Sequence, residues 1–311
     1  MVEEFKQYLK SPEWRRQHRW RRAIWSTMAR MGLTGVHALP MNRRWVDIHR
    51  RKMPLPNLDP VYRGMRIVQI SDLHYSPVVW QRYLIQHVRW INDLEPDLVV
   101  VTGDLITGGY RYAKRIATIL SHINARHATI CTFGNHDYSI FGKRSIHEGR
   151  RRADYLEKCL LERGLTVLRN ATWELKLNGA HKPLTIVGLD DEWSGNIDPD
   201  TAFNGVEPDR PIICLNHNPV NVKELLHYPW QWMLSGHTHG RQIGTSKISR
   251  TLYPKLYRHY THGYYAVQGR HLYVNRGLSY GQRIQDWCRP EVTVFKLDHD
   301  QGQVVAEPDG H

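Results

Sequence analysis

The sequence predicts an α/β protein with a parallel sheet at its centre. Three short apolar runs have the length and β-branched content of buried strands: residues 65–71 (MRIVQIS), 97–103 (DLVVVTG) and 128–134 (ATICTFG). Between these runs, residues 80–94 and 111–125 are typical of helices. Strands and helices that alternate in this order form βαβ units, whose strands pair in parallel.

The second half of the chain predicts further strands. Residues 184–190 (LTIVGLD), 211–217 (PIICLNH) and 231–236 (QWMLSG) each predict a strand that enters a polar tip. Residues 264–277 (YYAVQGRHLYVNRG) resemble a hairpin, and residues 291–297 (EVTVFKL) predict the last strand. With 311 residues, of which 41% are hydrophobic, the chain can bury a sizeable core.

The N-terminal residues differ from the rest in charge. Residues 1–52 hold 13 Lys and Arg against 4 Asp and Glu, which accounts for most of the net charge of +13. Ser11 and Pro12 predict the start of a basic amphipathic helix. Its apolar face holds Trp20, Ile24, Met28 and Met31. Two roles fit this helix: residues 11–32 bind an anionic membrane surface, or the apolar face packs on the rest of the protein.

Two classes of protein are excluded by what the sequence lacks. It has no uncharged apolar run of about 18 residues and no apolar core of a secretory signal, so we expect a cytoplasmic protein without a membrane span. The four cysteines lie far apart without a CxxC spacing: Cys131, Cys159, Cys214 and Cys288. We therefore expect buried thiols rather than a disulfide framework or a thiolate zinc site.

Asp, Asn and His side chains gather where the predicted strands end. The five tips are Asp72–His74, Gly103–Asp104, Gly134–Asp137, Asn216–Asn218 and His237–His239. Open α/β sheets bind ligands beyond the carboxyl ends of their strands, so we expect these tips to converge. Oxygen and imidazole donors without thiolates suit Mn²⁺, Fe, Zn²⁺ or Mg²⁺. Packing alone is a poor explanation for the set, because burying so many unpaired polar groups is costly.

The spacing within the tips suggests how they bind. In extended chain, residues two apart leave from the same side, so Asp72 with His74, or His237 with His239, can hold one site. Glycines beside the ligands allow close approach of the backbone and turn conformations. These glycines are Gly103, Gly134, Gly236 and Gly240.

The ordered motifs DLH, GD, GNHD, NHNP and GHTHG resemble those of the calcineurin-like metallophosphoesterases, from about Met65 to Leu297. The resemblance implies a four-layer αββα sandwich with two metal ions above the strand ends. By that likeness the first metal has the ligands Asp72, His74, Asp104 and His239. The second has Asp104, Asn135, His217 and His237, with Asp104 as the bridge.

The resemblance also implies roles for the neighbouring residues. His136 faces the leaving group and protonates it, with Asp137 as a partner that orients it. Asn135 is assigned to substrate binding as well as to a metal. The expected division is a basic N-terminal arm (residues 1–52), an extended connector (residues 53–64) and a catalytic domain (residues 65–311).

The sequence around the motifs is similar to a bacterial branch that contains small phosphodiesterases and UDP-2,3-diacylglucosamine pyrophosphatases. The segments LPNLDPVYRGMRIVQISDLH, GNHDY, VGLDD and NRGLS carry this likeness. Arg241 stands where many members of the branch have Gly. Its guanidinium either clamps a substrate phosphate, pairs with Asp190 or Asp191, or points to solvent.

We therefore expect a phosphoester hydrolase with two divalent ions, Mn²⁺ first and Fe, Zn²⁺ or Mg²⁺ as alternatives. The ions outweigh the charges of Asp72 and Asp104, attract a phosphate and lower the pKa of water toward about 7. The basic arm favours a lipid-linked substrate such as UDP-2,3-diacylglucosamine, at the inner face of the cell membrane. The alternatives are a soluble diester, a nuclease, or an interaction module without metals. Nucleic acid is not expected, because most of the excess charge lies on the arm, and no obligate protein partner is indicated.

Overall fold

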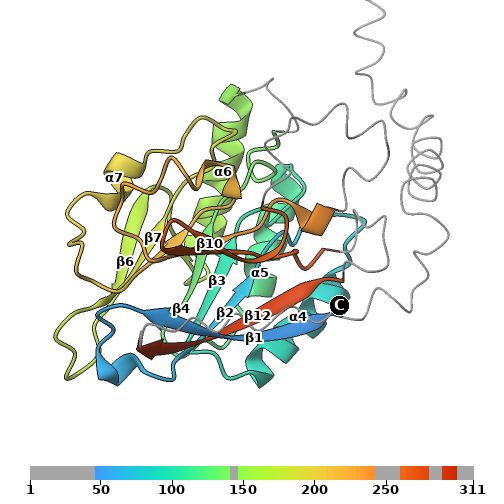
Figure 1. Cartoon of the computed structure of the whole chain (residues 1–311). Helices are drawn as coiled ribbons and strands as arrows, with labels where there is room; N and C mark the ends of the chain where they lie inside the picture. The colour runs from blue at the N-terminus through green and yellow to red at the C-terminus, as the bar shows by residue number, and fades with distance from the viewer. Residues whose placement is uncertain (1–45, 141–145, 242–259, 280–288, 300–311) are drawn as a thin grey trace, which may run out of the picture.

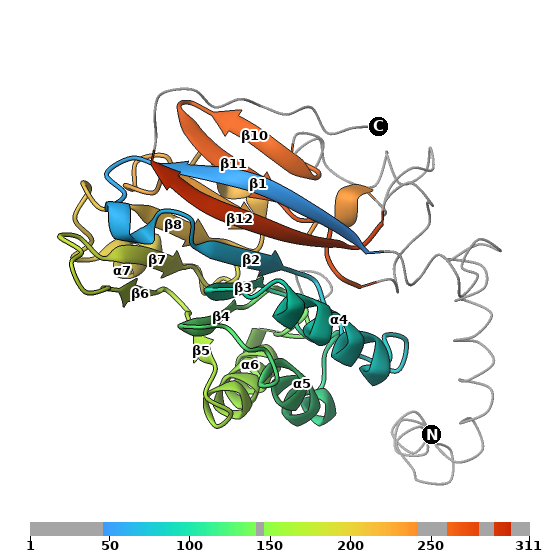
Figure 2. The ribbon, with the colours of Figure 1, turned by 90° about the horizontal axis from the view of Figure 1, so that it is seen from below.

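The computed structural model describes residues 46–140, 146–241, 260–279 and 289–299 (Figure 1). Two six-stranded sheets form the centre of the protein. Three helices lie together on one side of the first sheet: α4 (Gln81–Asp93), α5 (Ala113–Leu120) and α6 (Ile146–Leu161) (Figure 2). The basic amphipathic helix expected at residues 11–32 lies outside the described residues.

The first sheet has the strand order β1-β12-β2-β3-β4-β5. Its strands are β1 (Asp47–Leu55), β2 (Arg66–Ile70), β3 (Leu98–Thr102), β4 (Ala128–Thr132), β5 (Thr166–Val167) and β12 (Glu291–His299). Strands β2, β3 and β4 are parallel, with α4 and α5 between them in the chain, which confirms the predicted βαβ core. Strand β12 runs antiparallel to β2.

The second sheet has the order β10-β11-β9-β8-β7-β6. Its strands are β6 (Ala171–Leu175), β7 (Leu184–Gly188), β8 (Ile212–Leu215), β9 (Trp232–Ser235), β10 (Gly263–Val267) and β11 (Arg270–Val274). Strands β7, β8 and β9 are parallel, and β10 and β11 form the predicted hairpin. The carboxyl ends of three parallel strands from each sheet can therefore supply the site.

Alternation of apolar side chains along the strands builds the layers. In β2, Val68 packs with the core under α4 and α5, whereas Ile67 packs between the two sheets. In β8, Leu215 faces the first sheet, and Cys214 faces outward. Two short segments contribute to the outer side of the second sheet, α7 (Pro199–Phe203) and η4 (Pro219–Asn221). These layers confirm the αββα sandwich, although its second helical layer is thin.

The first strand corrects the expected boundaries. Strand β1 pairs in parallel with β12 along its whole length, from Asp47 opposite Glu291 to Leu55 opposite His299. Residues 47–52, assigned to the arm, and residues 53–55, assigned to the connector, thus belong to the first sheet. The alternation of charged side chains with buried Met53 and Leu55 suits an edge strand, where Pro54 is also tolerated.

Two expectations from composition can be compared with the structure. Cys131, Cys159 and Cys214 are buried and free, as predicted, and Cys288 lies outside the described residues. Among the helices in the described ranges, none combines the length and apolar character needed to cross a bilayer.

Candidate metal centre

The predicted ligand side chains meet where five parallel strands end. Six of the seven form two overlapping groups, in each of which one nitrogen or oxygen atom per residue lies within 4.8 Å of the others. The first group is Asp72, His74, Asp104 and His239, and the second is Asp104, His217 and His237. Asp72, His74 and Asp104 follow β2 and β3 of one sheet, and the histidines at positions 217, 237 and 239 follow β8 and β9 of the other.

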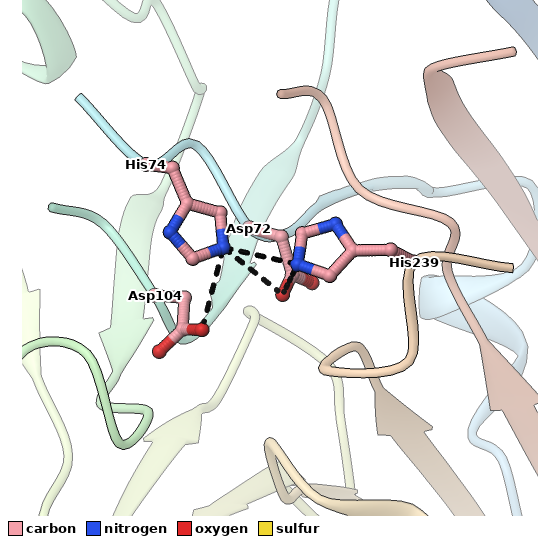
Figure 3. Close-up of side chains that lie close together, drawn as sticks. All are labelled: Asp72, His74, Asp104 and His239. Atoms are coloured by element: carbon pink, nitrogen blue, oxygen red, sulfur yellow. Dashed lines mark hydrogen bonds and ion pairs between the residues drawn. The ribbon is translucent and has the colours of Figure 1, made fainter. Parts of the chain in front are cut away.

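In the first group, ring nitrogens and carboxylate oxygens face one point (Figure 3). Nε2 of His74 lies 3.0 Å from Nε2 of His239. Nε2 of His239 is 3.3 Å from Oδ1 of Asp72, and Nε2 of His74 is 3.5 Å from Oδ2 of Asp104. Nitrogen and oxygen donors that converge in this way, all of them buried, fit a divalent cation.

The second group shares an atom with the first. Oδ2 of Asp104, which faces His74, also lies 3.4 Å from Nε2 of His217. Nε2 of His217 is in turn 3.3 Å from Nδ1 of His237. The Nδ1–H of His217 donates to the carbonyl of Thr102 at 2.7 Å, which leaves Nε2 directed at the site. A single carboxylate oxygen therefore lies between two clusters of donors.

Asn135, the seventh predicted ligand, has a buried oxygen that the described residues leave without a partner. Its side-chain Nδ2 donates to the carbonyl of Ile140 at 2.8 Å. Its Oδ1 is buried and has no hydrogen-bond partner in the described part of the chain. An unpaired buried acceptor costs free energy unless something binds it, and an amide oxygen is a suitable ligand for a divalent ion. The orientation of Asn135 therefore fits the predicted donor set.

The backbone at the ligands is not extended. Five ligand residues have positive φ: Asp72 (51°), His74 (45°), Asp104 (53°), His237 (70°) and His239 (49°). Side chains rarely adopt this left-handed conformation. Asp72 and His74 meet in one donor group as expected, but through a turn beyond the strand rather than in extended chain. His237 and His239 lie in different groups, so the expectation that this pair holds one site is wrong.

Hydrogen bonds between tips hold these turns. The N–H of Asp72 donates to the carbonyl of Gly103, and the N–H of His74 donates to the carbonyl of Asp104, both at 3.0 Å. The N–H of His237 donates to Oδ2 of Asp72 at 3.0 Å. That last bond joins the tip of β9 in the second sheet to the tip of β2 in the first. The left-handed residues are thus stabilised by their neighbours across the sheets.

The predicted role of the glycines is confirmed at two positions with close contacts. A Cβ on Gly236 would overlap Oγ of Ser71 and Oδ2 of Asp72. A Cβ on Gly134 would overlap Oδ1 of Asp104 and would lie 2.6 Å from the ring of His217. Both glycines therefore leave room for ligand side chains.

Electrostatics keeps most of the imidazoles neutral. Burial, reinforced by the charge of His217, lowers the pKa of His237 to about 3, and burial also holds the pKa of His74 well below its usual value. Burial alone would raise the pKa of Asp104, but His217, His136 and His74 together hold it well below its usual range. The same carboxylate outweighs burial at His217 and raises its pKa to about 10. A cation that binds Asp104 and His217 must therefore displace a proton.

Comparison with known proteins identifies this arrangement. Residues 65–241 match the family model of calcineurin-like phosphoesterases. The chain belongs to this family. YkuE of Bacillus subtilis (strain 168), an uncharacterized metallophosphoesterase, is 34% identical over 76% of this chain and 80% of its own length. The UDP-2,3-diacylglucosamine pyrophosphatase LpxG of Chlamydia trachomatis is 29% identical over 85% of this chain and 93% of its own length. The phosphodiesterase YaeI of Escherichia coli (strain K12) is 29% identical over 81% of this chain and 88% of its own length. The chain is a hydrolase with the metallophosphoesterase fold.

His136 lies at the open side of this phosphoesterase site. Its ring packs edge-on against the ring of His74, with centroids 4.6 Å apart, and it is only partly buried. Its backbone N–H donates to Oδ1 of Asp104 at 2.9 Å. Both carboxylate oxygens of Asp137 accept backbone N–H groups, from Ile106 at 3.1 Å and from Gly134 at 3.0 Å. Asp137 thus ties the β3 and β4 tips together, and its effect on His136 stays a prediction.

Asp191, which the sequence suggested only as a possible partner of Arg241, lies next to the site. It follows β7, is buried, and its Oδ2 accepts the N–H of Ser194 at 2.6 Å. Burial raises its pKa to about 7, against the opposing effect of His217. The sequence contained a pattern that could have indicated this position: the residues LDD directly follow strand β7, which is the neighbour of the ligand-bearing strand β8.

The predicted substrate residue Arg241 ends the short helix η5 (His239–Arg241), and its side chain lies outside the described residues. Pairing of Arg241 with Asp190 loses support. The carboxylate of Asp190 already pairs with Arg169 at 3.0 Å and accepts the hydroxyl of Tyr138 at 2.7 Å. Pairing with Asp191, whose buried Oδ1 has no hydrogen-bond partner among the described residues, a phosphate clamp and a solvent-facing guanidinium all stay open for Arg241.

The packing at Gly236 predicts that a single methyl group disturbs the first cluster. Gly236→Ala should displace Ser71 and Asp72 and weaken binding of Mn²⁺ by about 10–100-fold, the range for residues that orient ligands. Titration calorimetry with Mn²⁺ measures this. Gly195→Ala is the control, since its Cβ meets nothing within 4 Å and costs only about 1–2 kcal/mol of backbone strain. Equal affinities in the two variants would contradict the prediction.

Proposed function

We propose that this chain uses two divalent metal ions to hydrolyse a phosphodiester or pyrophosphate bond. The observation that carries the proposal is the position of Asp104, whose Oδ2 faces His74 in one donor group and His217 in the other. Two cations that share this oxygen would lie close together, as they do in two-metal hydrolases. Membership of the phosphoesterase family supports the same chemistry.

The donor groups define the ligands. Asp72, His74, Asp104 and His239 hold the first ion, and Asp104, Asn135, His217 and His237 hold the second. Mn²⁺ is the first choice, with Fe, Zn²⁺ or Mg²⁺ as alternatives, because all these donors are oxygen or imidazole nitrogen. When bound, the ions supply positive charge for the phosphate and lower the pKa of water toward about 7.

His136 acts as the general acid. It is the partly exposed residue of the GNHD motif, and the N–H bond to Asp104 fixes its backbone beside the donors. Its imidazole gives a proton to the oxygen that leaves the phosphorus. The amide of Asn135, next to it in the chain, contacts the substrate phosphate as well as the second ion, and Arg241 clamps a phosphate oxygen.

The substrate is lipid-linked, in the class of UDP-2,3-diacylglucosamine, and is reached from the inner face of the cell membrane. Two observations support this choice: the basic arm, and the similarity to LpxG over most of both chains. A soluble diester is the second candidate, because YaeI, named a phosphodiesterase, is equally similar.

The bridging role of Asp104 predicts loss of both activity and metal. Asp104→Asn keeps the size of the side chain but removes its charge, so hydrolysis of bis(p-nitrophenyl) phosphate should fall by more than about 100-fold. Metal content per chain, measured by mass spectrometry, should fall with it, while circular dichroism stays unchanged. The exposed Asp93→Asn is the control. Full turnover in Asp104→Asn would refute the two-metal assignment.

The position of His136 predicts a different outcome. His136→Ala should retain both metal ions and lose about 10²–10⁴-fold in rate, more for a poor leaving group than for a good one. Aryl diesters whose phenols differ in pKa measure this. His127→Ala, a partly exposed histidine just before β4, should have no effect. The same loss for every leaving group would exclude the acid role.

The charge of the arm predicts membrane binding. Deletion of residues 1–45, which keeps all of β1, should weaken sedimentation with vesicles of anionic phospholipid, since each basic residue near the surface contributes about 1 kcal/mol. Hydrolysis of a soluble diester should be unchanged. If the shortened protein binds the vesicles as well as the full chain does, the arm does not bind the membrane.

A further inference from the structure

A groove lies beside the donor groups, between the tip of β2 and the start of α5. It is lined by Tyr75, Ser76, Pro77, Arg111, Tyr112 and Arg115 and has a volume of about 420 Å³. This volume lies within the range of small-molecule sites, about 300–1,000 Å³. Of its lining residues, only Tyr75 directly follows a predicted metal ligand, His74.

The groove starts on the side of the site where His136 lies. The N–H of Thr107 donates to the carbonyl of Tyr75 at 3.4 Å, and the hydroxyl of Thr107 donates to the carbonyl of His74 at 3.2 Å. The carbonyl of Thr107 is 3.5 Å from Nδ1 of His136. One loop therefore contacts the groove, a ligand residue and the proposed acid. A group that leaves past His136 would enter this groove.

The groove carries positive charge without a carboxylate to balance it. The guanidinium of Arg111 lies 4.7 Å from the ring centre of Tyr112 and bonds to its hydroxyl. Arg115 is exposed and makes no hydrogen bond or ion pair within the described ranges. By contrast, Arg169 and Arg276 each pair with two or more carboxylates. The lining residues, all of them described, include neither Asp nor Glu.

The tyrosines shape the same space. The rings of Tyr75 and Tyr112 pack edge to face with centroids 5.7 Å apart, and Tyr75 is buried. Tyr112 contacts both the ring of Tyr75 and the guanidinium of Arg111. Aromatic rings with a cation at their side are suited to a planar group that carries a phosphate.

We propose that this groove binds a second phosphate on the leaving group, so that the enzyme prefers pyrophosphates whose leaving group is a phosphate monoester, such as a nucleoside monophosphate. This inference rests on the proposed function. A hydroxide oxygen, from a water that has already lost a proton to solvent, bonds to the attacked phosphorus, and the bond from that phosphorus to the bridging oxygen breaks. The bridging oxygen leaves with the electron pair on the second phosphate, takes a proton from His136, and its phosphate stays paired with Arg111 and Arg115.

The test compares two substrates of the full-length, Mn²⁺-loaded protein. UDP-glucose has an anionic leaving group, and bis(p-nitrophenyl) phosphate has a leaving group without a phosphate. The double variant Arg111→Gln, Arg115→Gln should lose about tenfold or more in kcat/KM for UDP-glucose, the effect of lost hydrogen bonds to a charged group. Its kcat/KM for bis(p-nitrophenyl) phosphate should be unchanged. Lys114→Gln, exposed on α5 but not part of the groove, is the matched control and should alter neither value.

Binding provides a second readout that needs no turnover. Uridine 5′-monophosphate should bind the double variant about tenfold more weakly than it binds the wild type, since the phosphate loses its guanidinium partners. Uridine, which lacks the phosphate, should not distinguish the two proteins.

The outcomes separate the groove from the proposed function. Two results would contradict the proposed role of the groove but not the two-metal chemistry. In the first, the wild type hydrolyses bis(p-nitrophenyl) phosphate but not UDP-glucose. In the second, the double variant loses kcat/KM equally for both substrates. A wild type that hydrolyses neither would count against the proposed function. Equal affinity of the wild type and the double variant for uridine 5′-monophosphate would contradict phosphate binding in the groove, whatever the kinetic result.

Discussion

One oxygen atom, Oδ2 of Asp104, makes the site depend on the whole fold. It belongs to the first sheet, yet it lies 3.4 Å from Nε2 of His217, which belongs to the second. The two tips meet only if the sheets pack face to face in a fixed register. Gln69, buried between them, helps to set that register, because its Nε2 donates to Thr102 in its own sheet and to the carbonyl of Ser235 in the other, both at 3.0 Å.

The same convergence explains why the ligand backbone is strained. Five ligand residues have positive φ, and each such residue costs about 1–3 kcal/mol unless its surroundings enforce it. His74 and His239, with Nε2 atoms 3.0 Å apart, also face each other without room for a proton on both nitrogens. Bonds between tips offset part of this cost, and cations bound in the proposed positions would offset more. The fold thus holds the donors in an arrangement that is more favourable with a bound metal ion than without one.

The sequence predicted what depends on local pattern and missed what depends on distant pairing. Strands β2 to β4 and the ligand tips were predicted because apolar runs and motif residues are adjacent in the chain. Strand β1 was missed because its charged residues and Pro54 resemble a linker until β12, more than 200 residues later, pairs with it. The left-handed turns were missed because residue type does not reveal φ. Asp191 and the arginine groove needed the tertiary structure to bring them beside the motifs.

This division between local and distant information bears on specificity. The motif residues at the strand tips supply the donors, so they account for the bond that is broken but not for the groups on either side of it. Those groups would contact side chains outside the motifs: Arg111 and Arg115 near His136, and Trp193, whose ring packs edge-on against His237 with centroids 4.9 Å apart. On this proposal, substitutions at α5 or in the loop after β7 would change the contacts to the substrate without moving a ligand, so proteins with the same motifs could act on different substrates.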